Sequence, residues 1–288
     1  TAEERDALDD WDTPESAAAA NPALATATVA LEVLTVEDGA SRTRADRVAV
    51  EDPLEIRCGR EPIAVTMRTP GADVDLAAGF LLGEGVLRER ADVLAIAPAG
   101  PNAVSVELSA SARARLPSAE RKFFTTSSCG VCGKTSLDRV RAALPERPAD
   151  ASTIDAGTIA RMPEALRAAQ NVFDRTGGLH GAGLFRGTDL VRFAEDVGRH
   201  NAVDKVLGAE LLAGRIPLRG PYALVLSGRI AFELVQKATL AGVSFVVAIG
   251  APTSAAVELA EAAGLVLVGF VRGERFNVYA GRARVTSR

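Results

Sequence analysis

The chain has 288 residues, a formal net charge of −4 and a charged fraction of 24%. This mildly acidic balance argues against broad non-specific binding to nucleic acid or to an anionic membrane surface. The hydrophobic content of 48% supports a sizeable core, and three cysteines, an odd number, fit a reducing cytoplasm better than a disulfide framework.

The chain begins with an acidic, alanine-rich segment over residues 1–27. This segment lacks the positive start and the apolar run of a secretory signal, and its composition predicts a disordered tail. The later apolar runs at 223–226 and 245–249 are too short to cross a bilayer. We therefore expect a cytoplasmic protein that does not insert into a membrane.

Residues 28–120 have a strand-rich pattern and are expected to form a smaller N-terminal lobe. Near-regular alternation of apolar and polar residues predicts strands at 29–33, 48–50, 63–67 and 104–108. One helix is expected over 75–87, because its apolar and small residues share a face. Residues 113–121 are polar and contain a proline, so they are expected to form a connector.

After residue 135 helices and strands alternate. Helices are expected over 136–144 and 158–172, separated by a link that contains proline and aspartate. Strands at 190–195, 222–227, 244–249 and 265–270 then alternate with helices at 199–213, 230–241 and 254–263. Continuous apolar strands between amphipathic helices predict an α/β sheet covered on both faces. Residues 136–288 are therefore expected to form an α/β domain, and the whole chain an α+β arrangement.

The loops that follow these strands form one candidate site. In such folds ligands bind beyond the carboxyl ends of the strands. The loops combine glycine, hydroxyl and arginine residues, which suits a phosphate or a dinucleotide. Arg272 and Arg275 bracket a Gly-Glu pair, either as an ordinary hairpin or as a bidentate fork for phosphate or guanine. The candidate pocket residues are Ser227, Arg229, Thr253, Arg272 and Arg275.

Both histidines of the chain are expected to lie in glycine-marked loops. His180 lies in TGGLHGAG, and His200 lies in EDVGRHN. Each is interpreted either as a structural histidine, in the core or at a helix start, or as a residue that lines a pocket. The shared glycine setting favours at least one histidine in a pocket. Lys205, one turn further on, is interpreted as part of a solvated helix face.

The densest chemical signal is the segment SSCGVCGK at 127–134, within a loop expected to be mobile over 121–135. It places Cys129 and Cys132 three residues apart, with Lys134 beside them. A nearby cation favours the thiolate form of a cysteine. The flanking glycines indicate an exposed loop, which is a poor place for inert buried thiols. Cys58, the remaining cysteine, is interpreted as a buried structural residue.

Four functions remain open for this cysteine pair on the residues alone. A zinc half-site would need two more ligands, and a thioredoxin-like redox pair would need a preceding apolar strand. A phosphate-binding loop has Ser128 where its first glycine should stand. In a sulfur carrier, Cys129 would take sulfane sulfur as a persulfide, and Cys132 would assist or resolve it as a disulfide.

Taken together, the motifs resemble the formate dehydrogenase accessory sulfurtransferase family (FdhD). The resemblance rests on SSCGVCGK, GGLHGAGLF, EDVGRHNAVDKVLG, LSGRIAFELVQKA, GAPTSAAVELA and GFVRGERFNVYAG, in this order. EPIAVTMRTPG and AAGFLLGEGVL in the N-terminal half belong to the same resemblance, which covers roughly residues 28–284.

The resemblance implies a sulfurtransferase that takes persulfide sulfur from a cysteine desulfurase on Cys129, with Cys132 as its partner. The sulfur passes to the molybdenum or tungsten bis-molybdopterin guanine dinucleotide cofactor of formate dehydrogenase, a bound substrate, and no intrinsic metal is implied. The implied fold is a cytidine-deaminase-like layered α/β core, and the implied state is a cytoplasmic homodimer. The implied cofactor-binding residues are Phe270, Val271, Arg272, Gly273, Glu274 and Arg275, with His180 standing where deaminases hold a metal ligand.

Two other functions remain as alternatives. A cofactor-binding chaperone would carry out no sulfur chemistry. A zinc-dependent deaminase-like enzyme would need a later PCxxC motif that the chain lacks. The sequence distinguishes neither molybdenum from tungsten nor which formate dehydrogenase is served.

Overall fold

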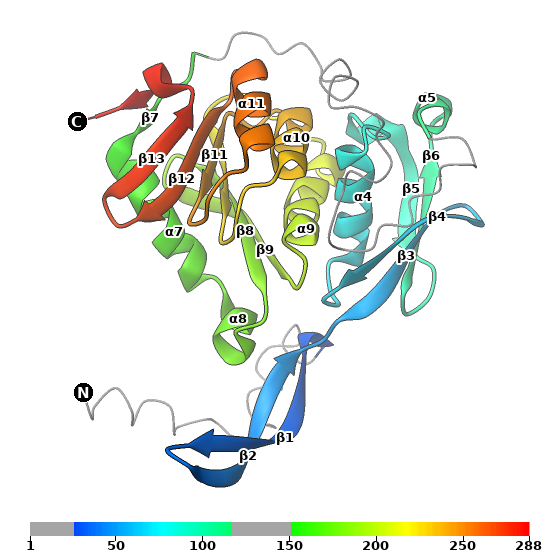
Figure 1. Cartoon of the computed structure of the whole chain (residues 1–288). Helices are drawn as coiled ribbons and strands as arrows, with labels where there is room; N and C mark the ends of the chain where they lie inside the picture. Colours follow the sequence, from blue (N-terminus) through cyan, green and yellow to red (C-terminus); the bar gives the residue numbers. More distant parts are fainter. Residues whose placement is uncertain (1–25, 117–150, 288) are drawn as a thin grey trace.

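A computed structural model describes residues 26–116 and 151–287 (Figure 1). Residues 1–25 of the expected tail over 1–27, the expected cysteine loop over 121–135 and the expected helix at 136–144 lie outside the described residues. The last tail residue, Ala27, is described and is buried. Cys129, Cys132 and Lys134 therefore have no structural account. The described residues contain no helix that is long and apolar enough to span a membrane.

The larger part of the described chain is built on a six-stranded sheet with the strand order β13-β12-β11-β10-β8-β9. Neighbouring strands are parallel from β10 to β12, while β8, β9 and β13 each run antiparallel to their neighbours. The strands are β8 (His180–Arg186), β9 (Asp189–Asp196), β10 (Tyr222–Leu226), β11 (Phe245–Ala248), β12 (Val266–Arg272) and β13 (Arg275–Ala280).

Both faces of this sheet are buried, as the apolar strand pattern predicts. In β10, Leu224 and Leu226 belong to one apolar cluster, and Ala223 and Val225 belong to another on the opposite face. This confirms the predicted α/β fold class. Helix α7 (Ala156–Ala168) packs on the second face, while α9 (Arg199–Leu212), α10 (Phe232–Ala241) and α11 (Ser254–Ala262) cover the first (Figure 1).

A second sheet has the strand order β4-β3-β6-β5. Helix α4 (Asp73–Gly83) lies between this sheet and α9 (Figure 1). One continuous cluster of buried apolar side chains includes residues of this sheet, of α4, and of the six-stranded sheet. The strands are β3 (Asp52–Cys58), β4 (Glu61–Arg68), β5 (Val93–Pro98) and β6 (Ala103–Leu108), with η1 (Arg90–Asp92) and α5 (Ala110–Ala114) beside them.

The helices α4 and α9 touch through their backbones. A Cβ atom on Gly79 of α4 would lie 1.9 Å from the carbonyl oxygen of Asp204 in α9. A Cβ atom on Gly208 of α9 would lie 1.8 Å from the carbonyl oxygen of Asp75 in α4. No side chain fits at either position, so the two glycines set how closely the N-terminal sheet and its helix approach the rest of the chain.

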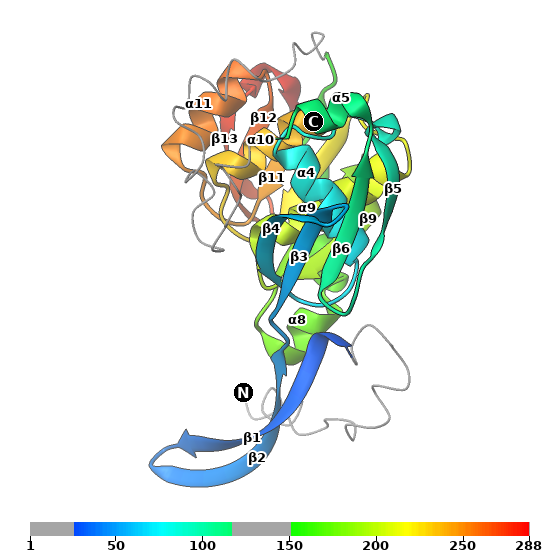
Figure 2. The same ribbon diagram turned by 90° about the vertical axis from the view of Figure 1, so that its right-hand side faces the viewer.

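A long hairpin of β1 (Thr28–Glu37) and β2 (Ala40–Ala49) projects from the body of the molecule (Figures 1 and 2). It forms a separate two-stranded sheet. Leu34 and Val36 near its tip are 66% and 64% exposed, so the hairpin has no apolar core of its own. At the other end of the described chain, η3 (Arg282–Arg284) leads into β14 (Val285–Thr286), which pairs with β7 (Ile154–Asp155).

The structure departs from the sequence-based expectation in several places. Strands β3 and β5 were not expected. The single helix expected over 158–172 is divided into α7 and the short α8 (Asn171–Thr176). The glycine-rich segment around His180 is a strand, β8, rather than a loop. Glycine weakens a strand on average, but here Cβ atoms on Gly181 and Gly183 would lie 2.8 Å from side-chain atoms of Gln170 and Leu190. The glycines therefore admit close neighbours.

Candidate functional site

The carboxyl ends of the parallel strands β10, β11 and β12 meet at one edge of the six-stranded sheet. Because β8 runs in the opposite direction, its first residue, His180, lies at this same edge and pairs with Asp196, the last residue of β9. The edge therefore gathers His180, the 195–200 turn, and the loops 227–231, 249–253 and 270–275. The predicted convergence of these segments at one edge is confirmed.

Backbone hydrogen bonds join the loops of this edge to one another. Gly250 N–H donates to the Gly228 carbonyl at 3.2 Å, and Phe270 N–H donates to the Gly250 carbonyl at 3.2 Å. A Cβ atom on Gly250 would lie only 2.6 Å from the Gly228 oxygen. The edge is thus a set of closely stacked backbone segments whose spacing requires glycine.

The two candidate hydroxyl groups both hold backbone in place. Ser227 Oγ accepts a hydrogen bond of 2.8 Å from the N–H of Gly181, next to His180. Thr253 Oγ1 accepts from the N–H of Ala256 at 3.3 Å, which makes Thr253 the N-cap of α11. Ser227 therefore fixes the start of β8 against the end of β10, and Thr253 fixes the start of α11.

The segment 270–275 forms the turn of the β12–β13 hairpin. Arg272 pairs with Arg275 across the turn, and Gly273 has a φ of 54°. Phe270 has a left-handed φ of 56°, rare for a bulky residue, and lies at a register shift of the ladder. Its side chain is 41% exposed. The backbone of this segment is therefore a hairpin, which was one of the two interpretations of Arg272 and Arg275. Their role as a fork for phosphate or guanine, and the cofactor-binding role of the whole segment, stay predictions.

His180 is half-buried, and its imidazole lies against Gly228, where a Cβ atom would be 3.3 Å from Nδ1. Burial lowers the pKa of His180, and the nearby charges of Arg199 and His200 lower it further. Arg229 acts in the same direction, and only Asp196 opposes them. The structure therefore favours a neutral His180 at physiological pH.

Arg199 and His200 are the first two residues of α9. His200 Nε2 lies 3.8 Å from a carboxylate oxygen of Glu233, in the first turn of α10. The pKa of Glu233 is lowered, first by its interaction with His200 and further by the charge of Arg199. Sequence reasoning singled out neither Arg199 nor Glu233, because their proximity depends on two helix starts meeting at this edge.

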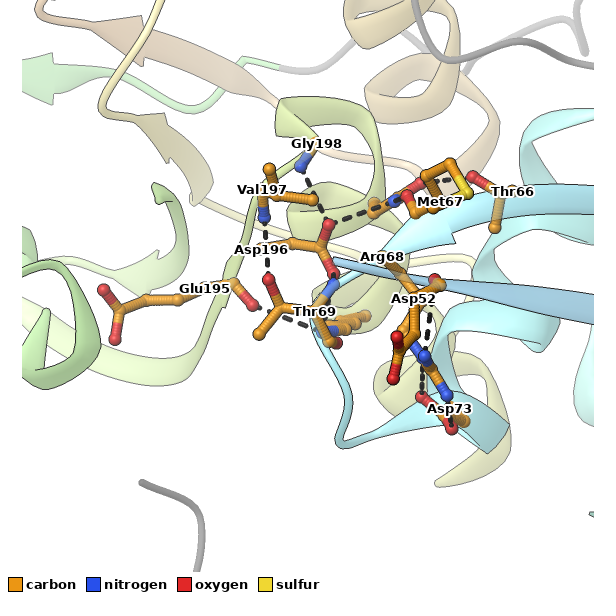
Figure 3. A network of polar contacts seen from close by, with 12 residues as sticks. Asp52, Thr66, Met67, Arg68, Thr69, Asp73, Glu195, Asp196, Val197 and Gly198 are labelled. Carbon is orange, nitrogen blue, oxygen red and sulfur yellow. Dashed lines mark hydrogen bonds and ion pairs between the residues drawn. The ribbon is translucent and has the colours of Figure 1, made fainter. Parts of the chain in front are cut away.

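A buried polar network supports the 195–200 turn (Figure 3). Asp196 is fully buried and accepts hydrogen bonds from the N–H groups of Gly198 at 2.8 Å and Thr69 at 3.2 Å. Asn201 Nδ2 donates to it at 3.0 Å. Val197 N–H in turn donates to Thr69 Oγ1 at 3.2 Å. Because Thr69 follows β4, this network ties the N-terminal sheet to the candidate site.

Lys205 completes this network. Its side chain is 4% exposed, and its Nζ lies 2.7 Å from Asp196 Oδ2 and 2.8 Å from the Thr69 carbonyl oxygen. The interpretation of Lys205 as part of a solvated helix face is wrong, because α9 is buried between α4 and the six-stranded sheet.

Two further sequence-based statements concern cysteines and metals. Cys58 is a free, buried cysteine in β3 and belongs to the main apolar cluster, as its structural interpretation predicts. Within 26–116 and 151–287, histidine, cysteine, aspartate and glutamate side chains nowhere gather in threes that could hold a metal ion. Cys129 and Cys132 lie outside these ranges.

Comparisons with known proteins give consistent results. The model of the FdhD/NarQ family matches residues 49–286. A protein of Streptomyces coelicolor named "Sulfur carrier protein FdhD" is 48% identical over 269 residues, which cover 89% of this chain and 95% of that protein. A protein of the same name from Mycobacterium tuberculosis is 48% identical over 259 residues, covering 85% of this chain and 93% of its own length.

The fold also has a counterpart among solved structures. The crystal structure of a protein described as a formate dehydrogenase accessory protein from Desulfotalea psychrophila superposes with a TM-score of 0.73. The match covers 90% of this chain and all of that chain, at 24% sequence identity. At this level of identity the likeness concerns the fold.

Proposed function

Because the chain belongs to the FdhD/NarQ family, we propose that it is a sulfur carrier that serves formate dehydrogenase. The observation that carries the proposal is the 48% identity, across most of the chain, to proteins named as sulfur carriers. The sequence also holds the two closely spaced thiols that such chemistry needs, Cys129 and Cys132. The proposal makes Cys129 the sulfur-bearing residue.

Loading of sulfur is a thiol exchange without net oxidation. The Cys129 thiolate attacks the terminal sulfur of a persulfide on a cysteine desulfurase. The donor's S–S bond breaks, the donor cysteine leaves as a thiolate, and Cys129 becomes a persulfide. Lys134, five residues further on, favours the anionic form of the loaded sulfur through its charge.

Delivery uses the second cysteine. The Cys132 thiolate attacks Cys129 Sγ, and the terminal sulfur leaves with the bonding electron pair as hydrosulfide, which the metal of the bound guanine dinucleotide cofactor accepts. A Cys129–Cys132 disulfide remains. A cellular dithiol reductant then returns both cysteines to thiols, so the two electrons carried by the delivered sulfide are restored.

The carboxyl edge of the six-stranded sheet is the proposed seat of the cofactor that receives the sulfur. The exposed, conformationally fixed Phe270 offers an aromatic face to the guanine. The exposed Arg272 and Arg275 offer bidentate donors to phosphate or guanine. The remaining proposed contact residues are Val271, Gly273, Glu274, Ser227, Arg229, Thr253 and His180.

A mass measurement tests the sulfur chemistry directly. After incubation with a cysteine desulfurase and cysteine, the protein should gain the mass of one sulfur atom on Cys129, and reductant should remove it. Cys129→Ala should abolish the gain, whereas Cys58→Ala, a change of the buried thiol in β3, should leave it intact. The Cys132→Ala variant should accept sulfur on Cys129 normally but transfer it poorly to the cofactor.

The alternatives predict different outcomes. If Cys129→Ala still supports formation of active formate dehydrogenase, the protein is a cofactor-binding chaperone rather than a sulfur carrier. If the purified protein contains one zinc per chain and a chelator removes its activity, the deaminase-like alternative holds.

A further inference from the structure

The acidic segment at residues 1–25 differs in charge from the rest of the chain. It contains seven acidic residues and one arginine, which gives a net charge of −6. The whole chain has a net charge of −4, so the remaining residues together carry +2. Exposed charges act over only about 8 Å at physiological ionic strength. An attraction within the molecule therefore requires a cationic surface that the acidic segment can reach.

The carboxyl edge of the six-stranded sheet is such a surface. Arg229, Arg272 and Arg275 are exposed there, and Arg199 is partly exposed. Among the residues that the structure describes, none of these guanidinium groups lies within ion-pair distance of a carboxylate. Glu274 is the one exposed carboxylate in the described loops of this edge. The edge therefore carries an excess of positive charge.

The acidic segment joins the described fold beside this edge. Ala27, the residue before β1, is 4% exposed, and Thr28 pairs with Ala49 across the base of the hairpin. A Cβ atom on Gly178 would lie 3.6 Å from the Cβ atom of Ala49, and Gly178 stands two residues before His180 at the edge. Strand β2 also contacts α8, which lies next to the base of the hairpin (Figure 2). The chain thus leaves the fold close to the candidate site.

The DDWD segment, residues 9–12, combines the two chemical features of a guanine nucleotide. The indole of Trp11 is a planar fused ring system, as guanine is, and the carboxylates on either side of it are anions, as phosphates are. Fifteen residues separate Trp11 from Ala27, and fifteen extended residues span up to about 50 Å. The DDWD segment can therefore reach the carboxyl edge of its own chain.

We propose that the DDWD segment binds to the carboxyl edge and competes with the cofactor as an autoinhibitory contact. This inference rests on the proposed function, which assigns the edge to the cofactor. The indole of Trp11 stacks on the ring of Phe270, which is 41% exposed. The neighbouring carboxylates accept bidentate hydrogen bonds from Arg272 and Arg275. The segment occupies the edge until the guanine dinucleotide displaces it.

Attachment to the same chain makes even a weak contact effective. A segment tethered close to its target acts at an effective concentration on the order of 1 mM. With a Kd of about 0.1 mM for the free segment, the tethered segment lowers the apparent affinity of the edge for a nucleotide about tenfold. A contact of this strength still gives way to a cofactor that binds more tightly.

The fluorescence of Trp11 gives a direct readout, because it is the only tryptophan of the chain. Quenching by acrylamide, a neutral molecule, should be weak in the full chain and should increase when GDP is added. Phe270→Ala should increase the quenching without GDP, because it removes the ring that the indole stacks on. Leu94→Ala is the matched control and should change nothing, since Leu94 is a 66% exposed apolar residue of β5 in the other sheet. Equal quenching with and without saturating GDP would overturn the proposal.

Calorimetry with GDP measures the competition itself. The full chain with Asp9→Asn, Asp10→Asn and Asp12→Asn should bind GDP about tenfold more tightly than the unmodified chain at low salt. The difference should disappear at high salt, where exposed charges are screened. These substitutions lie outside the described fold, so a change in GDP affinity does not reflect a loss of its packing. An unchanged affinity at low salt would refute the contact.

A second variant separates the DDWD segment from net charge alone. Glu3→Gln, Glu4→Gln and Asp6→Asn remove the same number of charges from the acidic segment but leave DDWD intact. Their gain in GDP affinity should be clearly smaller, and a gain equal to that of the first variant would contradict the role of DDWD. Acrylamide quenching that changes with protein concentration would place the segment on a second copy and overturn the intramolecular contact.

Failure of this inference can be told from failure of the proposed function. Loading of sulfur on Cys129 by a desulfurase requires no acidic segment, so the variant with Asp9→Asn, Asp10→Asn and Asp12→Asn should load to the same extent as the unmodified chain. If both chains bind GDP with the same affinity, only the autoinhibitory contact is refuted. If neither binds GDP, the assignment of the carboxyl edge to the cofactor fails, and this inference fails with it.

Discussion

The ammonium group of Lys205 lies 2.7 Å from the carboxylate of Asp196, with the two side chains 4% and 0% exposed. The same ammonium group donates to the carbonyl of Thr69, 2.8 Å away. One buried cation thus holds the end of β9, the middle of α9 and the loop after β4 together. The candidate site depends on this buried contact, although Lys205 was expected on a solvated helix face.

Lys205→Met should destabilise the protein strongly. Removing the ammonium group leaves the Asp196 carboxylate buried without its counter-charge, which typically costs about 3–5 kcal/mol. The measurement is chemical denaturation at neutral pH. Arg44→Met is the control, because Arg44 and Asp46 form an ion pair in which both side chains are more than a third exposed (44% and 38%); its cost should stay below about 1 kcal/mol. Equal costs for the two variants would contradict the structural role of Lys205.

Gly79→Ala should separate α4 from α9. The added Cβ atom would lie 1.9 Å from the backbone oxygen of Asp204, which cannot move without displacing the helix. We expect a loss of about 3 kcal/mol or more in the free energy of unfolding, measured by denaturation. Gly178→Ala is the control, since its Cβ atom would have no neighbour nearer than 3.6 Å. A harmless Gly79→Ala would mean that the two helices are not in backbone contact.

Phe270 allows backbone strain and ligand contact to be measured separately. Phe270→Gly relieves the left-handed φ of 56°, whereas Phe270→Ala keeps it, so the glycine variant should be the more stable of the two by about 1 kcal/mol. Both should bind GDP more weakly, by about tenfold, because both lose the aromatic face. Unchanged GDP binding in both variants would remove Phe270 from the cofactor site.

Glu210 should contribute to stability at neutral pH and lose that contribution in acid. Burial acts to raise its pKa, but hydrogen bonds from Arg215 and Arg192 outweigh burial and lower it. A carboxyl group whose pKa is lower in the folded state stabilises the fold above its unfolded pKa, near 4.3, and less as the pH falls below that value.

The pH dependence of unfolding checks this assignment. Glu210→Gln should lower the midpoint of denaturation at pH 7 and flatten the loss of stability below about pH 4.5. The exposed Glu107→Gln serves as the matched control. A Glu210→Gln variant that loses stability in acid as steeply as the unmodified protein would show that another carboxylate is responsible.

The parallel part of the fold could be predicted closely from sequence. The strand expected at 222–227 is β10 at Tyr222–Leu226, and the helix expected at 254–263 is α11 at Ser254–Ala262. The strands are continuous apolar runs in the sequence. The start of α11 is marked in the sequence by Thr253, whose hydroxyl group caps the helix. The convergence of their loops followed from the rule that parallel strands end at one edge.

The rest could not be read from local patterns. Strand β8 contains Gly181 and Gly183, which lower strand propensity but admit the side chains of Gln170 and Leu190. Lys205 follows an ordinary helical pattern, and only the packing of α4 against α9 buries it. The contact between His200 and Glu233 joins two helix starts 33 residues apart in sequence, at a separation of 3.8 Å. Each of these features is tertiary.

The β1–β2 hairpin has a consequence for the way the chain opens. The base of the hairpin contacts α8, but its outer part is a two-stranded ribbon with exposed apolar side chains, so little free energy holds the ladder closed there. In a hydrogen–deuterium exchange experiment, the amide hydrogens of the hairpin should exchange at the earliest time points. Those of β10 and β11, which are buried on both faces of the sheet, should exchange last. The molecule therefore combines a rigid sheet, which carries the candidate site, with an arm that samples open states continually.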